Sequence, residues 1–248
     1  MSQMNQEAVY ILNRREYKES SLLLDIISPN YGRLSIIANG ALKSKKGLSA
    51  MLQVFQPLLM TWTGRSSLKT LVSVDAPSTA LLLNGRKLFS AYYLNELLLK
   101  LVPQDQSSTT SFTTLFIHYA KSLQDLTTTH DIEIPLREFE YHLLSDLGLL
   151  PDLSYDVDGH LIVADKWYQL IPNMGFKVID QTKVNTSACF LGIYLIKFSD
   201  FSAEMYTDKE YMLQIKRLMR SLIHDLLGGQ ELKSRALFQS YQPFRSSK

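Results

Sequence analysis

The sequence has a single cysteine, Cys189, among its 248 residues. One cysteine excludes an internal disulfide and any zinc module built from several cysteines. No apolar run approaches the roughly 20 residues that cross a bilayer, and Met1 to Gln6 lack the apolar segment of a signal peptide. We therefore expect a protein of the reducing cytoplasm with no membrane partner.

Short motifs of common catalytic sites are also missing. The five histidines lie far apart without an HExxH pair, and the sequence contains no GxSxG, P-loop or GxGxxG. Asp156, Asp158 and His160 alternate in a predicted loop, but Gly159 makes a surface turn a simpler interpretation than a cation site. We predict no catalytic residue, no metal ligand, no cofactor and no enzymatic activity, and we interpret Cys189 as a core thiol.

The formal net charge of +2 conceals an uneven distribution. Residues 1–80 contain nine Lys/Arg and five Asp/Glu, residues 81–205 contain nine and fifteen, and residues 206–248 contain eight and four. Both ends of the sequence are thus basic and its middle is acidic. This arrangement suits a protein that meets a polyanion with part of its surface, although net charge alone does not identify the polyanion.

Residues 1–79 have the pattern of short strands separated by turns. The candidate strands are Ala8 to Arg15, Ser21 to Ile27, Leu34 to Ala38, Phe55 to Thr63 and Leu68 to Val74. Pro57 forces the start of the fourth to be an edge or a bulge. Five short strands in so few residues favour a small barrel, and its basic loops indicate an OB-fold, a frequent oligonucleotide binder.

Residues 80–248 are predicted to form an α-helical domain, which gives the chain an α+β fold. Apolar residues recur at helical spacing in 89–101, 112–126, 136–147 and 212–226, and 187–198 indicates a short helix. Residues 152–185 fit neither pattern and are interpreted as a small irregular insertion. Within it, Leu161–Val163 and Tyr168–Ile171 resemble a hairpin.

Several separated stretches point to one family. They are Glu19–Asp25, Tyr31–Leu34, Ala38–Ala41, Leu52–Leu58, Leu68–Leu71, Tyr92–Leu97, Leu136–Glu140, Leu147–Gly148, Leu227–Gly229, Leu232–Arg235 and Leu237–Phe238. In this order they resemble the RecO family of bacterial recombination mediator proteins. The resemblance extends over nearly the whole chain, with a poor match only from Asp152 to about Thr207.

The resemblance implies an OB-fold followed by a helical domain, and binding and annealing of single- and double-stranded DNA. It also implies that the protein, together with RecR, helps RecA replace single-strand binding protein (SSB) on DNA. A monomer associated with the nucleoid is expected. Many members carry a four-cysteine zinc module in the helical domain, and its absence here indicates the zinc-free branch.

Two basic sets are the candidate DNA contacts, since Lys and Arg neutralise phosphates without regard to sequence. The first, on the barrel, is Arg14, Arg15, Lys18, Arg33, Lys43, Lys45, Lys46, Arg65 and Lys69. The second, near the end of the sequence, is Lys216, Arg217, Arg220, Lys233 and Arg235. The alternative for each residue is a solvated surface charge. Tyr17, Tyr31 and Trp62 are candidates for base stacking, although Trp62 lies among apolar residues that favour a core position.

For this family, the SSB partner site is expected to receive an acidic tail that ends in a phenylalanine carboxylate. Such a site needs an apolar pocket with a cation at its rim. The candidate residues are Phe112, Phe116, Leu136, Arg137 and Phe139. Alternatively, Arg137 pairs with Glu133, Glu140 or Tyr141 of its own helix and the aromatic residues belong to the core.

Two other functions stay open at this point. An OB-fold protein that binds RNA would prefer ligands with a 2′-hydroxyl group. A protein–protein adaptor without nucleic-acid binding would be insensitive to charge reversal at Lys43, Lys45 and Lys46.

Overall fold

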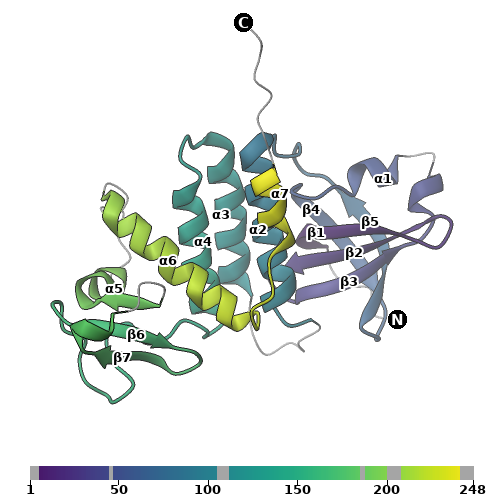
Figure 1. Cartoon of the computed structure of the whole chain (residues 1–248). Helices are drawn as coiled ribbons and strands as arrows, with labels where there is room; N and C mark the ends of the chain where they lie inside the picture. The colour runs from purple at the N-terminus through teal and green to yellow at the C-terminus, as the bar shows by residue number, and fades with distance from the viewer. Residues whose placement is uncertain (1–5, 45–46, 105–111, 185–187, 200–207, 241–248) are drawn as a thin grey trace, which may run out of the picture. The chain divides into compact units, whose positions relative to one another are not determined.

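The computed structural model describes residues 6–44, 47–104, 112–184, 188–199 and 208–240 of the chain (Figure 1). An N-terminal closed barrel of five strands is followed by helices and a small three-stranded sheet. The chain thus has the predicted α+β fold. It divides into two compact units: one contains the residues up to Phe139 and those from Leu232 onward, and the other contains Glu140–Glu231.

The barrel confirms the five predicted strands with small changes at their ends. They are β1 (Glu7–Tyr17), β2 (Ser21–Ser28), β3 (Gly32–Ala38), β4 (Leu58–Thr63) and β5 (Leu68–Asp75), in the order β1-β2-β3-β5-β4, and β1 pairs with β4 to close the barrel. β4 begins after Pro57, not at the predicted Phe55, because Phe55 adopts φ +62° and turns the chain.

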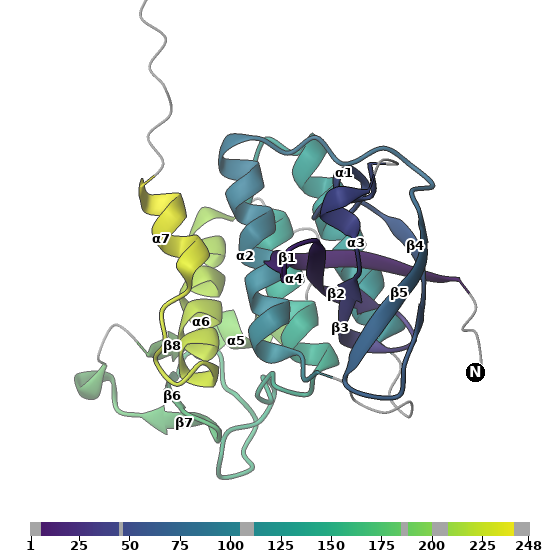
Figure 2. The ribbon, with the colours of Figure 1, turned by 90° about the vertical axis from the view of Figure 1, so that its right-hand side faces the viewer.

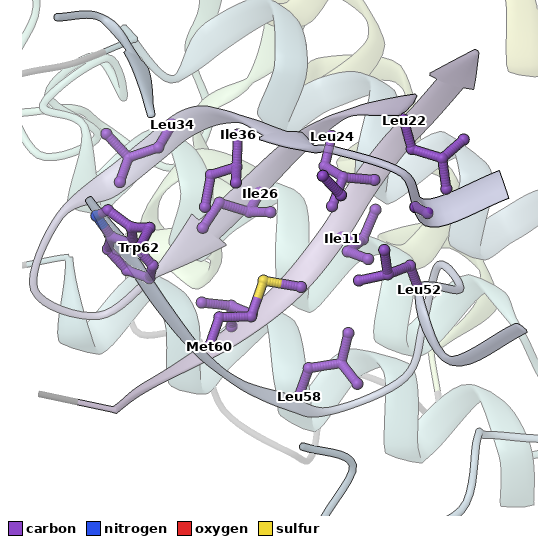
Figure 3. Packing of buried hydrophobic residues seen from close by; sticks show 13 residues of the cluster. Ile11, Leu22, Leu24, Ile26, Leu34, Ile36, Leu52, Leu58, Met60 and Trp62 are labelled. Atoms are coloured by element: carbon purple, nitrogen blue, oxygen red, sulfur yellow. The ribbon is translucent and has the colours of Figure 1, made fainter. Parts of the chain in front are cut away.

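The barrel interior is filled by alternate side chains of its strands. In β3 buried and half-buried positions alternate without exception, as period-2 patterning requires. Leu34 and Ile36 point inward to meet residues such as Ile26, Met60 and Trp62 (Figure 3). Trp62 is 2% exposed, which confirms the predicted core position.

Helices of the same unit cover the outer side of β1 and β2. They are α2 (Gly85–Leu101) and α3 (Thr113–Thr128), and Figure 2 shows both running alongside the barrel. The ring of Tyr10 packs 5.5 Å from Phe116 and 5.3 Å from Tyr119. This cover explains why four consecutive residues of β1 are buried, where an uncovered strand would alternate.

A buried polar network fixes these helices to the barrel. The Asn95 amide donates to the Leu12 carbonyl at 2.7 Å, and the Tyr119 hydroxyl donates to Asn95 Oδ1 at 2.5 Å. Desolvation raises the pKa of Tyr119 well above its ordinary value, so the phenol stays protonated and can donate.

Two further helices follow later in the chain. α4 (Glu133–Asp146) carries the predicted third apolar pattern, and α7 (Lys233–Ser240) packs along α2. The sequence analysis did not predict α7. The Glu96 carboxylate accepts hydrogen bonds from the backbone N–H groups of Lys233 and Ser234, at 2.9 and 2.8 Å, and so caps the N-terminus of α7.

The second unit begins within α4 and, in its described residues, also contains a three-stranded sheet and helices α5 (Gly192–Ser199) and α6 (Lys209–Leu226). The strands are β6 (Trp167–Ile171), β7 (Gly175–Ile179) and β8 (Cys189–Leu191). The predicted hairpin partner was wrong: Tyr168–Ile171 pairs with β7, and Leu161 forms only an isolated bridge with Tyr155.

α5 begins later than the predicted helix over 187–198 because β8 comes first. The junction between them requires glycine, since a Cβ on Gly192 would lie 2.0 Å from the Val163 carbonyl oxygen. Cys189 is buried, as predicted. None of the helices in the part of the chain that the structure describes combines the length and apolar character needed to span a bilayer.

Candidate nucleic-acid interface

One end of the barrel gathers several of the predicted cations. The β1–β2 turn carries Lys18, and the Leu42 N–H donates to the Ser20 carbonyl of this turn at 2.9 Å. Leu42 belongs to the short 3₁₀ helix η1 (Ala41–Lys43) after β3, so Lys43 lies beside the turn. We call residues 15–20 and 39–44 the turn end of the barrel.

Arg14 holds the segment that follows these lysines. Its Nη1 donates to the carbonyls of Ser49 and Leu52 at 3.0 and 2.8 Å, and its Nη2 contacts Ser49 Oγ at 3.2 Å. Ser49 lies in the short helix α1 (Leu48–Met51). Arg14 therefore positions the basic segment against β1, a role that the sequence analysis did not predict.

The described cations of the turn end itself face solvent. Arg15 and Lys43 are exposed, and their side chains make no hydrogen bond or ion pair with any residue that the structure describes. The Lys18 ammonium lies 5.3 Å from the ring centroid of Tyr17, a cation–π contact at the surface. The predicted contacts Lys45 and Lys46 lie outside the described residues. Exposed cations without protein partners are available to phosphates.

The opposite end of the barrel is covered by helices. We call residues 28–35, around the β2–β3 turn, the helix-covered end. The Phe112 N–H, at the start of α3, donates to the Pro29 carbonyl at 2.9 Å, and Arg33 Nε donates to the Val102 carbonyl after α2 at 2.8 Å. Burial lowers the pKa of the Arg33 guanidinium below its ordinary value, and the Asp25 carboxylate opposes this change.

Arg65 lies in the β4–β5 connection, and Lys69 is the second residue of β5. Because β5 runs parallel to β3 and Leu68 pairs with Ser35, the connection lies on the same side of the barrel as the start of β3. The Lys69 ammonium donates to the Ser66 carbonyl at 2.8 Å. Arg65 is exposed and has no hydrogen bond or ion pair in the described chain. The barrel set thus separates into a turn-end group and a group near the helix-covered end.

The second basic set is divided between the two compact units. Lys216, Arg217 and Arg220 lie on α6, whereas Lys233 and Arg235 lie on α7. Arg217 donates to Gln214 at 2.6 Å and to the Cys189 carbonyl at 3.2 Å, and its guanidinium lies 5.3 Å from the ring centroid of Phe190. These contacts give Arg217 a packing role inside its unit.

The aromatic residues predicted for the SSB-tail pocket pack within the first unit. The Phe112 ring lies 2.6 Å from the position of a Cβ on Gly32, Phe116 contacts Tyr10, and Phe139 lies 6.0 Å from Tyr119. These contacts favour the core interpretation of the aromatic residues.

Two α4 residues of the predicted pocket, Leu136 and Arg137, are 7% and 5% exposed. Arg137 Nη2 lies 3.8 Å from Glu133 Oε2, one of the within-helix partners that the sequence suggested. A tail-binding pocket here stays a prediction.

Asp156 organises a turn. Its Oδ1 accepts hydrogen bonds from the backbone N–H groups of Asp158 and His160 at 3.0 and 2.8 Å. The bond from His160 is the largest cause that lowers the pKa of Asp156. Within the described residues, no cluster of three or more His, Cys, Asp or Glu is placed to hold a metal ion.

Asn95, which fixes the helices to the barrel, was not predicted from the sequence. It stands between Leu94 and Leu97 on the apolar face of α2 and is 2% exposed. A polar residue on an apolar helix face was the signal, because a buried amide must find hydrogen-bond partners.

Comparison with known proteins gives matches along nearly the whole chain. The family profile described as "Recombination protein O N terminal" matches residues 1–79, and the profile described as "Recombination protein O C terminal" matches residues 82–236. The boundary between the two profiles falls in the connection between β5 and α2.

Individual relatives show the same extent of similarity. The DNA repair protein RecO of Aliivibrio salmonicida is 37% identical over 230 residues, 92% of this chain and 93% of the relative. The proteins of the same name from Coxiella burnetii and Idiomarina loihiensis are each 36% identical, over 233 and 232 residues. These alignments cover 93% and 92% of this chain and 96% and 95% of the relatives.

Proposed function

The chain belongs to the RecO family of DNA repair and recombination proteins, and from this premise we propose that it binds single- and double-stranded DNA and anneals complementary strands. We assign DNA contact to the barrel domain, residues 1–79, and partner docking to the helical domain, residues 80–248 with its insertion at 152–185. The proposed role is non-catalytic, since annealing forms and breaks no covalent bond.

The turn end of the barrel is the observation that supports this function most directly. Arg15 and Lys43 are exposed without protein partners, and Arg14 fixes the segment next to them. Cations held on a rigid barrel neutralise phosphates without reading bases, so affinity falls steeply as salt rises.

Annealing follows from neutralisation. Two complementary strands repel each other through their phosphates, and a protein that lowers this repulsion on both brings them together. We propose that the barrel holds one strand and that exposed cations outside it, Arg220 on α6 or Lys233 on α7, contact a second.

Mediation requires delivery to DNA that SSB already covers. We propose that the acidic SSB tail docks near Arg137, whose guanidinium would pair with the terminal carboxylate. In the structure Arg137 is 5% exposed, so docking at this position requires the surrounding side chains to open. With RecR, the bound protein would then help RecA replace SSB.

Annealing of two complementary oligonucleotides, followed by fluorescence at low and high salt, tests the proposal. The test variant changes Lys43, Lys45 and Lys46 to Glu. A matched control changes the exposed Lys166, Lys177 and Lys183 to Glu, which alters net charge equally. We expect salt-sensitive annealing that slows at least about a hundredfold in the test variant only, because three phosphate contacts become repulsive.

Other results would change the assignment. Annealing that survives the test variant would move the principal DNA site to α6 or α7. Absence of DNA binding at low salt would favour the adaptor function, and stronger competition by RNA than by DNA of the same sequence would favour RNA binding.

A further inference from the structure

The second unit contains a cavity that the DNA function does not use. Its volume is about 260 Å³, and three segments line it: Gly148–Pro151 after α4, Leu170–Gly175 at the β6–β7 turn, and the last turn of α6. We call it the hairpin cavity.

The walls of the hairpin cavity are fixed by the fold. The Val157 N–H donates to the Phe176 carbonyl at 2.8 Å, and a Cβ on Gly175 would lie 3.9 Å from the Cβ of Pro151. The Leu149 N–H donates to the Leu144 carbonyl at 2.7 Å, which closes the end of α4. The cavity is thus built between an ordered hairpin and two helix ends.

The lining side chains are mostly apolar, and two polar ones, the Asn173 amide and the Asp225 carboxylate, lie among them. Leucine, isoleucine, proline and methionine side chains form most of the wall, and Asp225 contributes a carboxylate; no Lys or Arg takes part. Met174, at the hairpin tip, is 70% exposed. A flexible methionine at the edge of an apolar recess adapts to different apolar side chains.

Two features favour a cation at this cavity. Gly148, which follows the C-terminus of α4, and Leu226, the last residue of α6, both line it, and each helix C-terminus carries about half a negative charge. Asp225 adds a full charge in the last turn of α6, where a cation would normally be favourable. Its side chain is exposed and makes no hydrogen bond or ion pair with the described residues.

We propose that the hairpin cavity docks a segment of a partner protein in which a large apolar side chain adjoins a lysine or arginine. The cavity is smaller than the roughly 300 Å³ at which sites for drug-sized ligands begin, so it suits one or two side chains. The apolar side chain fills the recess, and the cation meets Asp225 and the helix ends. This charge preference disfavours DNA and acidic peptides, so the site is independent of the proposed DNA function.

Selection from a display library of short random peptides on the full chain tests this proposal. Three versions serve as bait: the natural protein, Asp225→Lys and the control Asp165→Lys, which makes the same charge change at an exposed carboxylate outside the lining. Lysine near a helix C-terminus favours the helix, so Asp225→Lys should fold.

We expect enriched peptides that pair a large apolar residue with a neighbouring Lys or Arg. Their affinity, measured by fluorescence anisotropy, should fall about tenfold with Asp225→Lys and less than about twofold with Asp165→Lys. Replacing the apolar residue of the peptide by serine should also abolish binding. Enrichment of acidic peptides, no enrichment, or equal loss with both variants would overturn the proposal.

Discussion

The two ends of the barrel use positive charge in different ways. At the helix-covered end, Arg33 donates to the Val102 carbonyl, and helices α2 and α3 bond to the neighbouring backbone. At the turn end, Arg15 and Lys43 have no protein partner among the described residues. At the first end the arginine binds a helix terminus, whereas at the second the cations are exposed and available to a ligand.

The residue type alone therefore does not assign a role. A guanidinium that satisfies backbone carbonyls stabilises the fold, because removal leaves buried acceptors without donors. An exposed ammonium with no partner contributes little to stability and is available to phosphate. The same contrast appears between Arg15 of the turn end and its neighbour Arg14.

A pair of glycines, one at each end of the barrel, separates the two ends most strongly. Gly32 has φ +61° and a Cβ there would lie 2.6 Å from the Phe112 ring, whereas Gly40 has φ +69° and open space around it. Gly32→Ala should cost about 3 kcal/mol or more of unfolding free energy from backbone strain plus overpacking. Gly40→Ala should cost only about 1 kcal/mol from strain.

Urea unfolding followed by Trp62 fluorescence checks this prediction, in a Trp167→Phe background that removes the other tryptophan. Equal losses for the two variants would show that the helix-covered end is not packed as tightly as the Phe112 contact indicates.

Sequence patterning could predict the barrel and its basic end. It could not predict which cations form hydrogen bonds within the protein. Alternation in Leu34–Ala38 and the turn signals around it determine the strand, so β3 was found. Arg14 and Arg15 are chemically identical neighbours, and a register shift between Ile11 and Asn13 in the β1–β2 pairing bears on which of them faces α1. Such an irregularity is set by tertiary pairing and leaves no local signal.

In the insertion, too, the local sequence did not determine which segments pair. Leu161–Val163 and Gly175–Ile179 are both short and apolar, and both are near Tyr168–Ile171 in sequence. Asn173 and Gly175 both adopt positive φ, and the turn that they form pairs Tyr168–Ile171 with Gly175–Ile179. The eight-residue α7 was missed because its N-terminal cap comes from Glu96, far away in sequence.

The second prediction separates the neighbouring arginines. Arg14→Ala removes three contacts to the α1 segment and should cost about 2 kcal/mol of unfolding free energy, and it should weaken DNA binding by releasing that segment. Arg15→Ala should change stability by less than about 0.5 kcal/mol and weaken DNA binding directly. Urea unfolding and titration of labelled single-stranded DNA give both quantities, and a stability loss with Arg15→Ala that matches Arg14→Ala would contradict the assignment.

Substitution of one exposed cation on either side of the barrel should change DNA binding only slightly. Lys43→Gln should lower single-stranded DNA affinity about fivefold and reduce the slope of log K against log salt by about 0.7, the loss of one phosphate contact. The Arg65 side chain also has no partner among the described residues, but it is distant from the turn end. Arg65→Gln should therefore change the slope little. Both residues are exposed, so neither change should alter stability, and the salt series isolates the electrostatic contact. Equal slope changes would place DNA across the whole barrel surface, and a change with Arg65→Gln alone would move the interface to the β4–β5 connection.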